Sequence, residues 1–328
     1  MASSLPSTAP SSSNQIRFDN QVAIITGSGG GLGRVYAIDL AKRGAKVVIN
    51  DVGMIPSPHD PNKKISAADA VVEEIKAFGG IAIADKHSVE EGDAIVQFTM
   101  QHFGPEIHIL INNAGILRDI SFGKITNKEW NAVLNVHLRG TFKITRAVWP
   151  IMMKQQYGRI LMVSSAAGIY GNVGQANYSA AKLALVGLAN VLAMEGGKKG
   201  IQVNTIAPIA ASAMTASILP PDLLETLKPE YVSPAVLYLC SKQCQENGGL
   251  YELGAGWISK LRWERSESKF IPPIKDTTNS NTNEILTIET VEKYWEQINN
   301  FDNPSGHPTT NQDAFTTIMA LWMSLNNK

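Results

Sequence analysis

A glycine-rich turn between an apolar strand and an amphipathic helix sets the strongest limit on how this chain can fold. Residues 21–26 (Gln-Val-Ala-Ile-Ile-Thr) predict a short buried strand, and the glycine turn follows at residues 27–33. The turn leads into a predicted helix at about residues 32–43. A second apolar strand at residues 45–50 is followed at once by Asp51. This order of strand, glycine turn, helix, strand and acid predicts a βαβ unit that binds a dinucleotide.

The turn and the acid suit two different parts of a dinucleotide. Glycines let the backbone turn tightly and approach a diphosphate, which then lies at a helix N-terminus where free N–H groups face it. Asp51 lies 24 residues after Gly27, where its carboxylate can accept hydrogen bonds from both ribose hydroxyls of an adenosine. A 2′-phosphate at that place would meet a like charge. The sequence therefore favours NAD over NADP.

The alternation of strands and helices continues along the chain. It predicts an α/β fold: a Rossmann-like, doubly wound parallel sheet with helices on both faces and ligands at the carboxyl ends of the strands. The further predicted strands are residues 81–85, 107–113, 159–164, 201–207 and 250–258, and the predicted helices are residues 67–78, 90–103, 127–155, about 176–196 and 233–241.

A tyrosine and a lysine four residues apart form a candidate acid–base pair. Tyr178 and Lys182 lie among alanines and leucines that favour a helix, so both side chains lie on one helix face. A positive charge about 4 Å from a phenol contributes the roughly 4 kcal/mol that lowers its pKa by about three units. Tyr-x-x-x-Lys alone is a weak signal.

Composition excludes several classes of partner. Basic and acidic residues both total 29, so the net charge of zero suggests no nucleic acid and no anionic membrane surface as a partner. No run approaches the roughly 18 apolar residues of a membrane span. Cys240 and Cys244 have no accompanying histidine cluster, which indicates buried thiols rather than a metal site or a disulfide. Residues 1–15 are rich in serine and proline, and we expect a disordered leader without a secretory signal.

Several motifs together resemble those of the short-chain dehydrogenase/reductase family. They are Thr26-Gly27-x-x-x-Gly31-x-Gly33, Asn112-Asn113-Ala114-Gly115, Ser165 and Tyr178-x-x-x-Lys182. Three longer strings resemble the (3R)-hydroxyacyl-CoA dehydrogenase units of peroxisomal multifunctional enzymes. These strings begin at Asn112, at Gly168 (Gly-Ile-Tyr-Gly-Asn) and at Trp263 (Trp-Glu-Arg). The resemblance covers roughly residues 17–266.

The resemblance implies NAD-dependent oxidation of a (3R)-3-hydroxyacyl-CoA to a 3-ketoacyl-CoA in fatty-acid β-oxidation. Tyr178 would be the general base, Ser165 would orient the substrate oxygen, and Lys182 would lower the tyrosine pKa and hold the nicotinamide ribose. The implied cofactor-binding residues are Gly27, Ser28, Gly31, Leu32, Gly33, Asp51, Ser88, Val89, Asn113, Lys182 and Pro208. It also implies a homodimer, an acyl-CoA substrate and a peroxisomal location. The chain ends in Asn-Asn-Lys rather than a Ser-Lys-Leu-type signal, so the cytoplasm is the alternative.

Three positions depart from the family pattern. His137 stands where many members have an asparagine that serves a water relay; it is either a further catalytic residue or a structural histidine. His87 stands where an aspartate usually meets the adenine amino group, and a neutral imidazole can accept through only one ring nitrogen. We therefore expect NAD affinity to fall below about pH 6.5, the ordinary histidine pKa. Ala213 replaces a common arginine in a predicted lid at residues 209–230.

The predicted domain organisation is a leader at residues 1–15, a dehydrogenase domain at 16–266, a linker at 267–286 and a helical extension at 287–328. Two helices are predicted in the extension, at residues 289–298 and 313–325. The extension is too short for a hydratase, so we expect a stand-alone enzyme or an excised part of a multifunctional one. Two other functions stay open: a 17β-hydroxysteroid or ketoacyl/polyketide oxidoreductase on the same scaffold, and a non-catalytic cofactor-sensing protein.

Overall fold

The computed structural model describes residues 15–57, 60, 62–210, 225–267, 271, 274–275, 284–310 and 312–326. Residues 1–14 of the predicted leader and most of the predicted lid, including Ala213, lie outside the described residues. The chain divides into two compact units, Met1–Lys260 and Leu261–Lys328, and each is described by itself.

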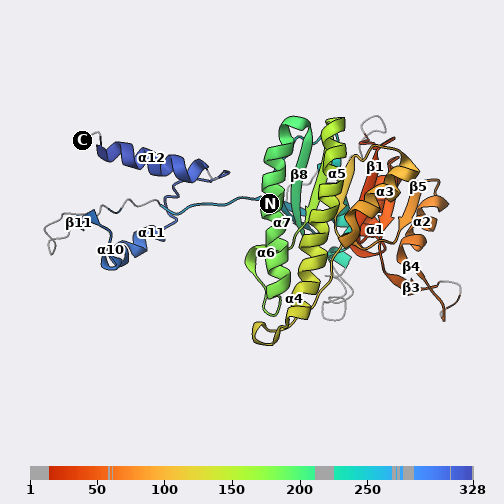
Figure 1. Ribbon diagram of the computed structural model, residues 1–328, viewed down its shortest axis with the longest axis horizontal. Helices are drawn as coiled ribbons and strands as arrows, with labels where there is room; N and C mark the ends of the chain where they lie inside the picture. Colours follow the sequence, from red (N-terminus) through yellow and green to blue (C-terminus); the bar gives the residue numbers. More distant parts are fainter. Residues whose placement is uncertain are drawn as a thin grey trace, which may run out of the picture. The chain divides into compact units, whose positions relative to one another are not determined.

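The first unit is built on a sheet of eight strands in the order β10-β9-β8-β7-β6-β1-β2-β5. Figure 1 shows β8, β1 and β5 following one another across this sheet. Neighbouring strands from β9 to β5 run parallel. The strands are β1 Val22–Thr26, β2 Lys46–Asn50, β5 Ile81–Asp85, β6 Ile109–Asn112, β7 Gly158–Val163, β8 Ile201–Pro208, β9 Leu250–Gly254 and β10 Trp257–Leu261.

Both faces of this sheet are covered by helices, because successive strand residues point to opposite sides and nearly all of them are apolar. Ile24 and Val48 pack with α3, α5 and α7, whereas the adjacent Ile25 and Ile49 pack with α1, α2 and α9. The predicted doubly wound α/β fold is confirmed. The helices are α1 Gly31–Lys42, α2 Ala67–Ala77, α3 Gly92–Phe103, α4 Asn127–Leu134, α5 Thr141–Gln155, α6 Ala166–Tyr170, α7 Ala176–Gly196 and α9 Ser233–Cys240, with single 3₁₀ turns at η2 Val89–Glu91, η3 Phe122–Lys124, η5 Gly197–Lys199 and η6 Pro229–Tyr231.

The strand order reverses between β1 and β6. From β1 the chain moves outward to β2 and β5, and it then returns to β6 on the other side of β1. In open α/β sheets such a reversal leaves a crevice at the carboxyl ends of the two strands, where ligands bind. The glycine turn follows β1 and Asn113 follows β6, so the two motifs meet at this crevice.

The structure of the first unit differs from the predicted elements at several places. The predicted helix at residues 127–155 is α4 and α5 joined by a π-helical segment, η4 Asn135–Gly140. The predicted strand at residues 250–258 is two strands, because Ala255 (φ 52°) and Gly256 (φ 77°) reverse the chain between β9 and β10. The polar excursion after β2 contains an antiparallel pair, β3 Met54–Pro56 and β4 Lys64–Ser66.

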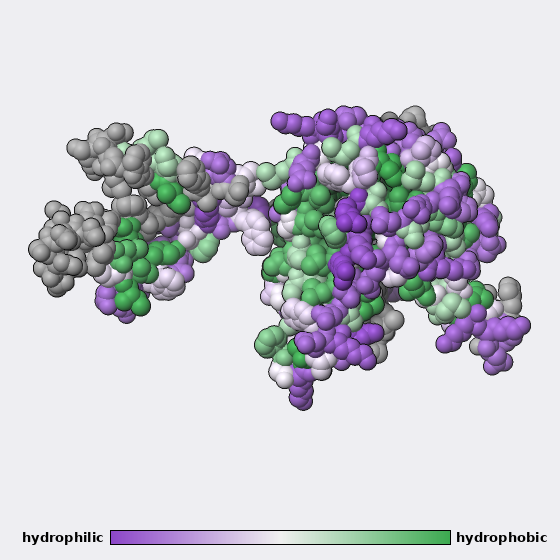
Figure 2. Space-filling model, in the orientation of Figure 1, coloured by the Kyte–Doolittle hydropathy of each residue, from purple (hydrophilic) through white to green (hydrophobic). Residues whose placement is uncertain are grey.

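Helix α7 is unusually apolar. Together with the turn that follows it, Ala176–Lys199 is the one stretch among the described residues that is long and apolar enough, by length and composition, to cross a membrane. Its inner side explains part of this composition, since Leu185 and Ala189 are buried in the core beside β8. Its outer side is also apolar, with Val191 and Met194 exposed, and Figure 2 shows hydrophobic residues gathered over α6 and α7.

The second unit contains the predicted helical extension. The predicted helix at residues 289–298 is two short helices, α10 Ile288–Lys293 and α11 Trp295–Ile298, and the other is α12 Gln312–Asn326. A short antiparallel pair, β11 Ile274–Lys275 and β12 Glu284–Ile285, lies within the predicted linker. Arg265 joins the parts of this unit by a backbone bridge to Gly306 and a hydrogen bond from Nη1 to Thr317 Oγ1 (3.1 Å).

Candidate active site

The glycine turn fits tightly against the segment that follows β6. Gly27 has a φ of +64°, and a Cβ there would lie 2.7 Å from the Cα of Ala114. A Cβ on Gly33 would lie 2.5 Å from the carbonyl oxygen of Gly27. Gly31 has a φ of +51° but faces open space. Two of these glycines are therefore needed for close packing, and the third for backbone conformation.

Helix α1 begins at this turn with its N-terminus open. Its N-cap is Gly30, which makes no side-chain cap, and its first turn contains no acidic residue. The unpaired N–H groups and the helix dipole favour an anion here. Among the predicted contact residues of the turn, Ser28 points inward and donates from Oγ to Ile25 O (2.7 Å), and Leu32 packs against the core. These two side chains support the turn from inside.

Asp51 is held in place by the backbone on both sides. Its Oδ2 accepts from Gly29 N at 2.8 Å and its Oδ1 from Gly53 N at 2.7 Å. A carboxylate has about four lone-pair sites, so each oxygen can accept one further hydrogen bond. The side chain is thus a fixed hydrogen-bond acceptor at the carboxyl end of β2.

Asn113, which follows β6, is bonded to the glycine turn that follows β1. Its Nδ2 donates to the carbonyl oxygens of Thr26 and Gly27, both at 3.0 Å. Thr26 Oγ1 in turn accepts from the backbone N–H groups of Asn113 and Ala114, both at 3.0 Å. Asn113 therefore fixes the glycine turn beside the end of β6.

Ser165, Tyr178 and Lys182 come together from two adjoining elements. Ser165 follows β7 and caps α6, where its Oγ accepts from Ala167 N at 3.2 Å. Tyr178 and Lys182 lie in the first turns of α7, with the Lys182 Nζ 5.5 Å from the Tyr178 ring centroid. Lys182 is 3% exposed, and its Nζ donates to Val163 O at 2.6 Å. The sequence-predicted triad therefore shares one site at the carboxyl end of β7.

The pKa values of Tyr178 and Lys182 differ from the sequence prediction. Burial raises the pKa of Tyr178 above 10, a side-chain hydrogen bond with Ser165 lowers it in part, and the charge of Asp119 raises it. Burial lowers the pKa of Lys182 from 10.5 to about 7. The expected lowering of the tyrosine pKa by the lysine does not hold here, because the ammonium lies on the Val163 carbonyl and is itself destabilised by burial.

His137 lies directly beside Tyr178. Its ring meets the Tyr178 ring edge-on, with centroids 5.1 Å apart and an interplanar angle of 88°. Its Nε2 lies 3.0 Å from Ile116 N and 2.8 Å from Ile116 O, and its buried Nδ1 has no partner among the described residues. Burial first, and then the charge of Lys182, lowers the His137 pKa to about 3, while a backbone hydrogen bond with Ile116 raises it. His137 is therefore neutral at pH 7.

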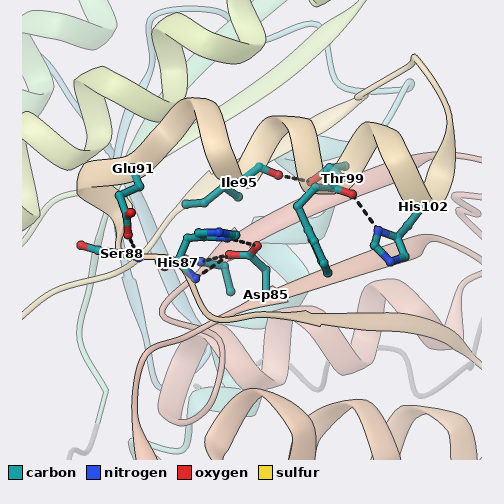
Figure 3. Close-up of polar contacts among 9 residues, drawn as sticks. Asp85, His87, Ser88, Glu91, Ile95, Thr99 and His102 are labelled. Carbon is teal, nitrogen blue, oxygen red and sulfur yellow. Dashed lines mark hydrogen bonds and ion pairs between the residues drawn. The ribbon is translucent and has the colours of Figure 1, made fainter.

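The carboxyl end of β5 carries a second polar cluster (Figure 3). His87 lies beside the buried carboxylate of Asp85, with Nδ1 2.8 Å from Oδ2. Ser88 caps η2 and forms a capping box with Glu91, and Val89 is buried against Gly140. The predicted contact residues Ser88 and Val89 thus shape the backbone beyond β5. Pro208, the last predicted contact residue, is partly buried at the end of β8.

Comparison with known proteins identifies the family. The sequence profile of the short chain dehydrogenase family matches residues 21–221. The chain belongs to the short-chain dehydrogenase/reductase family. Members of this family are oxidoreductases, so the triad and the glycine turn lie in the dehydrogenase scaffold that the sequence predicts.

Relatives within this family include multifunctional enzymes. The chain is 52% identical over 305 residues to peroxisomal multifunctional enzyme A of Dictyostelium discoideum, covering 93% of this chain and 66% of that protein. It matches the structure of full-length peroxisomal multifunctional enzyme type 2 from Drosophila melanogaster with a TM-score of 0.78 and 40% identity, over 94% of this chain and 51% of that one. It also matches a 7α-hydroxysteroid dehydrogenase complexed with NADH, with a TM-score of 0.66 and 28% identity over 75% of this chain and 98% of that one. The chain thus spans between about a third and two thirds of the length of the multifunctional enzymes that it matches.

Sequence reasoning missed two residues of this dehydrogenase site. Asp85 reads as the end of an apolar strand, and its pairing with His87 emerges only in the fold. Gly115 lies against His137, where a Cβ would be 2.3 Å from Cε1. Its place in the Asn-Asn-Ala-Gly motif was a signal, but the histidine that requires it is 22 residues further along the chain.

Proposed function

We propose that this chain oxidises (3R)-3-hydroxyacyl-CoA to 3-ketoacyl-CoA with NAD, as a dehydrogenase of peroxisomal fatty-acid β-oxidation. The observation that carries the proposal is that Ser165, Tyr178 and Lys182 come together at the carboxyl ends of the strands. The glycine turn and Asp51 lie at the same end of the sheet. The names of the multifunctional relatives support the peroxisomal location, and the acyl-CoA substrate rests on the resemblance of the sequence motifs.

The residues at the sheet edge fit NAD. The open N-terminus of α1 and the glycine turn suit a diphosphate, and the fixed Asp51 carboxylate suits a ribose diol. The same carboxylate would repel a 2′-phosphate. When bound, NAD accepts the hydride that leaves the substrate carbon.

Side chains of the site take up the proton of the substrate hydroxyl. Tyr178 takes the proton of the substrate hydroxyl, and Ser165, which shares a hydrogen bond with it, orients the same oxygen. Burial raises the Tyr178 pKa, and the hydrogen bond with Ser165 lowers it in part, so Ser165 also favours the phenolate as the proton is taken. We assign Lys182, whose Nζ bonds to Val163 O, to holding the nicotinamide ribose. Neutral His137 packs on the tyrosine ring, and we assign it to the route by which the proton leaves.

Tyr178→Phe tests this proposal. It should keep the fold and NAD binding but lower kcat by about 10²–10⁴-fold, the usual contribution of an acid–base group. Tyr238→Phe is the matched control, since Tyr238 is an exposed tyrosine on α9. Retention of more than about a tenth of kcat in Tyr178→Phe would remove the tyrosine from the acid–base role.

The substrate class is tested by steady-state assays with both C3 enantiomers of hydroxyacyl-CoA over a range of chain lengths, alongside 17β-hydroxysteroids and acyl-carrier-protein thioesters. The proposal requires the highest kcat/KM for a (3R)-hydroxyacyl-CoA. A higher value for a steroid or a carrier-protein thioester would favour the alternative oxidoreductase.

A further inference from the structure

Asp85 holds both the backbone and the ring of His87. The carboxylate lies at the end of β5 and is 1% exposed. Its Oδ1 accepts from Asn50 Nδ2 (2.6 Å) and from His87 N (3.2 Å), and its Oδ2 faces His87 Nδ1 (2.8 Å; Figure 3). Asn50 Nδ2 also donates to His87 O at 2.9 Å. The backbone of His87 is therefore held at its N–H and its C=O, and its imidazole is held by one contact with Asp85.

This contact decides which ring nitrogen carries the proton. An ionised carboxylate can only accept, so Nδ1 must be the protonated nitrogen when His87 is neutral. Nε2 then presents a lone pair, and it becomes an N–H donor when the ring is protonated. No described residue bonds to Nε2, and the His87 side chain is 42% exposed. Nε2 of His87 thus changes from a hydrogen-bond acceptor to a donor when the ring gains one proton.

The position of His87 places this atom beyond the proposed ribose site. Asn50 pairs with Asp85 in the β2–β5 register, so Asp51 and His87 follow neighbouring strands. Along the sheet edge the order is the glycine turn, Asp51 and then His87. A dinucleotide whose diphosphate meets the turn and whose ribose meets Asp51 extends next over β5. Val52, which is 66% exposed, offers an apolar contact for a ring there.

We propose that Asp85 is a positioning residue that makes His87 discriminate between 6-amino and 6-oxo purines according to the protonation state of His87. The inference rests on the proposed binding of NAD. Neutral His87 accepts a hydrogen bond from the 6-amino group of adenine, and protonated His87 donates one to the 6-oxo group of hypoxanthine.

Charged groups around His87 influence the pH at which its ring becomes protonated. Glu90 and Glu91 lie on η2, His102 lies on α3 behind Phe98, Asp51 follows β2, and the adjacent Lys86 pairs with Asp69 (2.7 Å). The hydrogen bond with Asp85 is the main cause that raises the His87 pKa above 6.5; burial lowers it, and the charges of Asp85 and Glu91 raise it. NAD affinity should therefore fall as pH drops through a value above 6.5, rather than below 6.5 as the sequence predicted.

The direct test is the dissociation constant of NAD and of nicotinamide hypoxanthine dinucleotide, measured by calorimetry between about pH 5.5 and 8.5, which spans the ordinary histidine pKa. We expect NAD to weaken by about fivefold to tenfold on acidification, the loss of one hydrogen bond, and the hypoxanthine analogue to tighten by a similar factor. Histidine NMR titration without cofactor gives the His87 pKa independently.

Two variants and one control sharpen the test. In Asp85→Asn, the new amide can donate to His87 Nδ1, which moves the ring proton to Nε2; preference should shift to the hypoxanthine analogue at every pH. His87→Gln should remove the pH dependence and bind both analogues alike, because an amide can rotate to donate or accept. His102→Gln is the control. His102 lies on α3, and its replacement should leave the pH dependence of both dissociation constants unchanged. Thermal unfolding confirms that each variant is folded.

The possible outcomes separate this inference from the proposed function. A ratio of the two dissociation constants that stays constant with pH, or a His87 pKa at or below 6.5, would overturn the role of Asp85 and His87 while leaving NAD as the cofactor. Failure of NAD to bind at any pH would instead contradict the proposed function.

Discussion

Lys182 is buried in the site with its ammonium on one carbonyl oxygen, and this burial should destabilise the fold. Its pKa of about 7 lies below the 10.5 of the unfolded chain, so the unfolded state binds a proton that the folded state binds weakly. Stability therefore falls as pH decreases from about 10.5 to about 7. The lysine is retained at a cost in stability, which is typical of a residue kept for function.

Lys182→Met should separate stability from activity. Removing the buried ammonium should raise the free energy of unfolding at pH 7 by about 1–3 kcal/mol, while turnover is lost. This gain should shrink toward pH 10, where the unfolded lysine begins to lose its proton. Urea unfolding at the two pH values measures it, with Lys154→Met on the exposed face of α5 as the control. A variant less stable than the parent at pH 7 would show that the Val163 hydrogen bond outweighs the burial.

Asp51 should decide between NAD and NADP. The double substitution Asp51→Ser, Val52→Arg removes the carboxylate that repels a 2′-phosphate and adds a guanidinium that can bind it. We expect the kcat/KM ratio of NADP to NAD to rise by at least tenfold, equivalent to about 1.4 kcal/mol. Asp69→Ser, which removes a nearby exposed carboxylate on α2, is the control. Equal use of NAD and NADP by the parent enzyme would contradict the role given to Asp51.

At the scale of elements, two glycines of the turn differ in how closely they are packed, and substitutions can test this difference. Gly27→Ser forces a Cβ to 2.7 Å from the Ala114 backbone at a φ of +64°, and it should destabilise the fold by about 1–3 kcal/mol. Gly30→Ser is matched to it: Gly30 has an extended φ of −168° and open space around it, and serine is a good N-cap. Thermal unfolding should show a loss only for Gly27→Ser; equal losses would mean that the turn is not packed as described.

The sequence predicted elements that carry a periodic signal and missed those that depend on contacts between distant residues. Strands such as β1 and β2 are continuous apolar runs, and the spacing of Tyr178 and Lys182 fixes a shared helix face. The π-helical segment around His137 has no such local signal, because residues 127–155 read as one helix. The link between Asp85 and His87 depends on the β2–β5 register, through which Asn50 reaches both.

The pKa values of the site were also beyond sequence reasoning. Helical spacing places Lys182 near Tyr178, but it cannot show that Nζ bonds to Val163 O or that both groups are buried. Burial reverses the expected direction for Tyr178. A motif therefore gives the identity and approximate proximity of catalytic groups, while their protonation depends on the surrounding fold.

At the scale of the whole molecule, helices α5 and α7 of the first unit carry apolar side chains on their outer face. A groove between these helices is lined by Phe142, Thr145, Arg146, Trp149, Leu188, Leu192 and Glu195. Exposed apolar side chains continue the surface, including Val191 at 51% and Met194 at 65% exposed. At about 1.5 Å per residue, α7 is roughly 30 Å long, enough to pair with a second copy along its length.

A homodimer through this face is our last prediction. A twofold pairing would bring α5 and α7 of each copy together as four helices, and the Arg146 and Glu195 of the groove could pair across the axis. Sedimentation should then give twice the 35.5 kDa chain mass. Val191→Glu places a charge on the exposed face and should yield monomers, because a buried unpaired charge is costly. Met100→Glu, on an exposed apolar position of α3, should stay dimeric. A parent protein that sediments at 35.5 kDa, or a dimer that Val191→Glu leaves intact, would place the interface elsewhere.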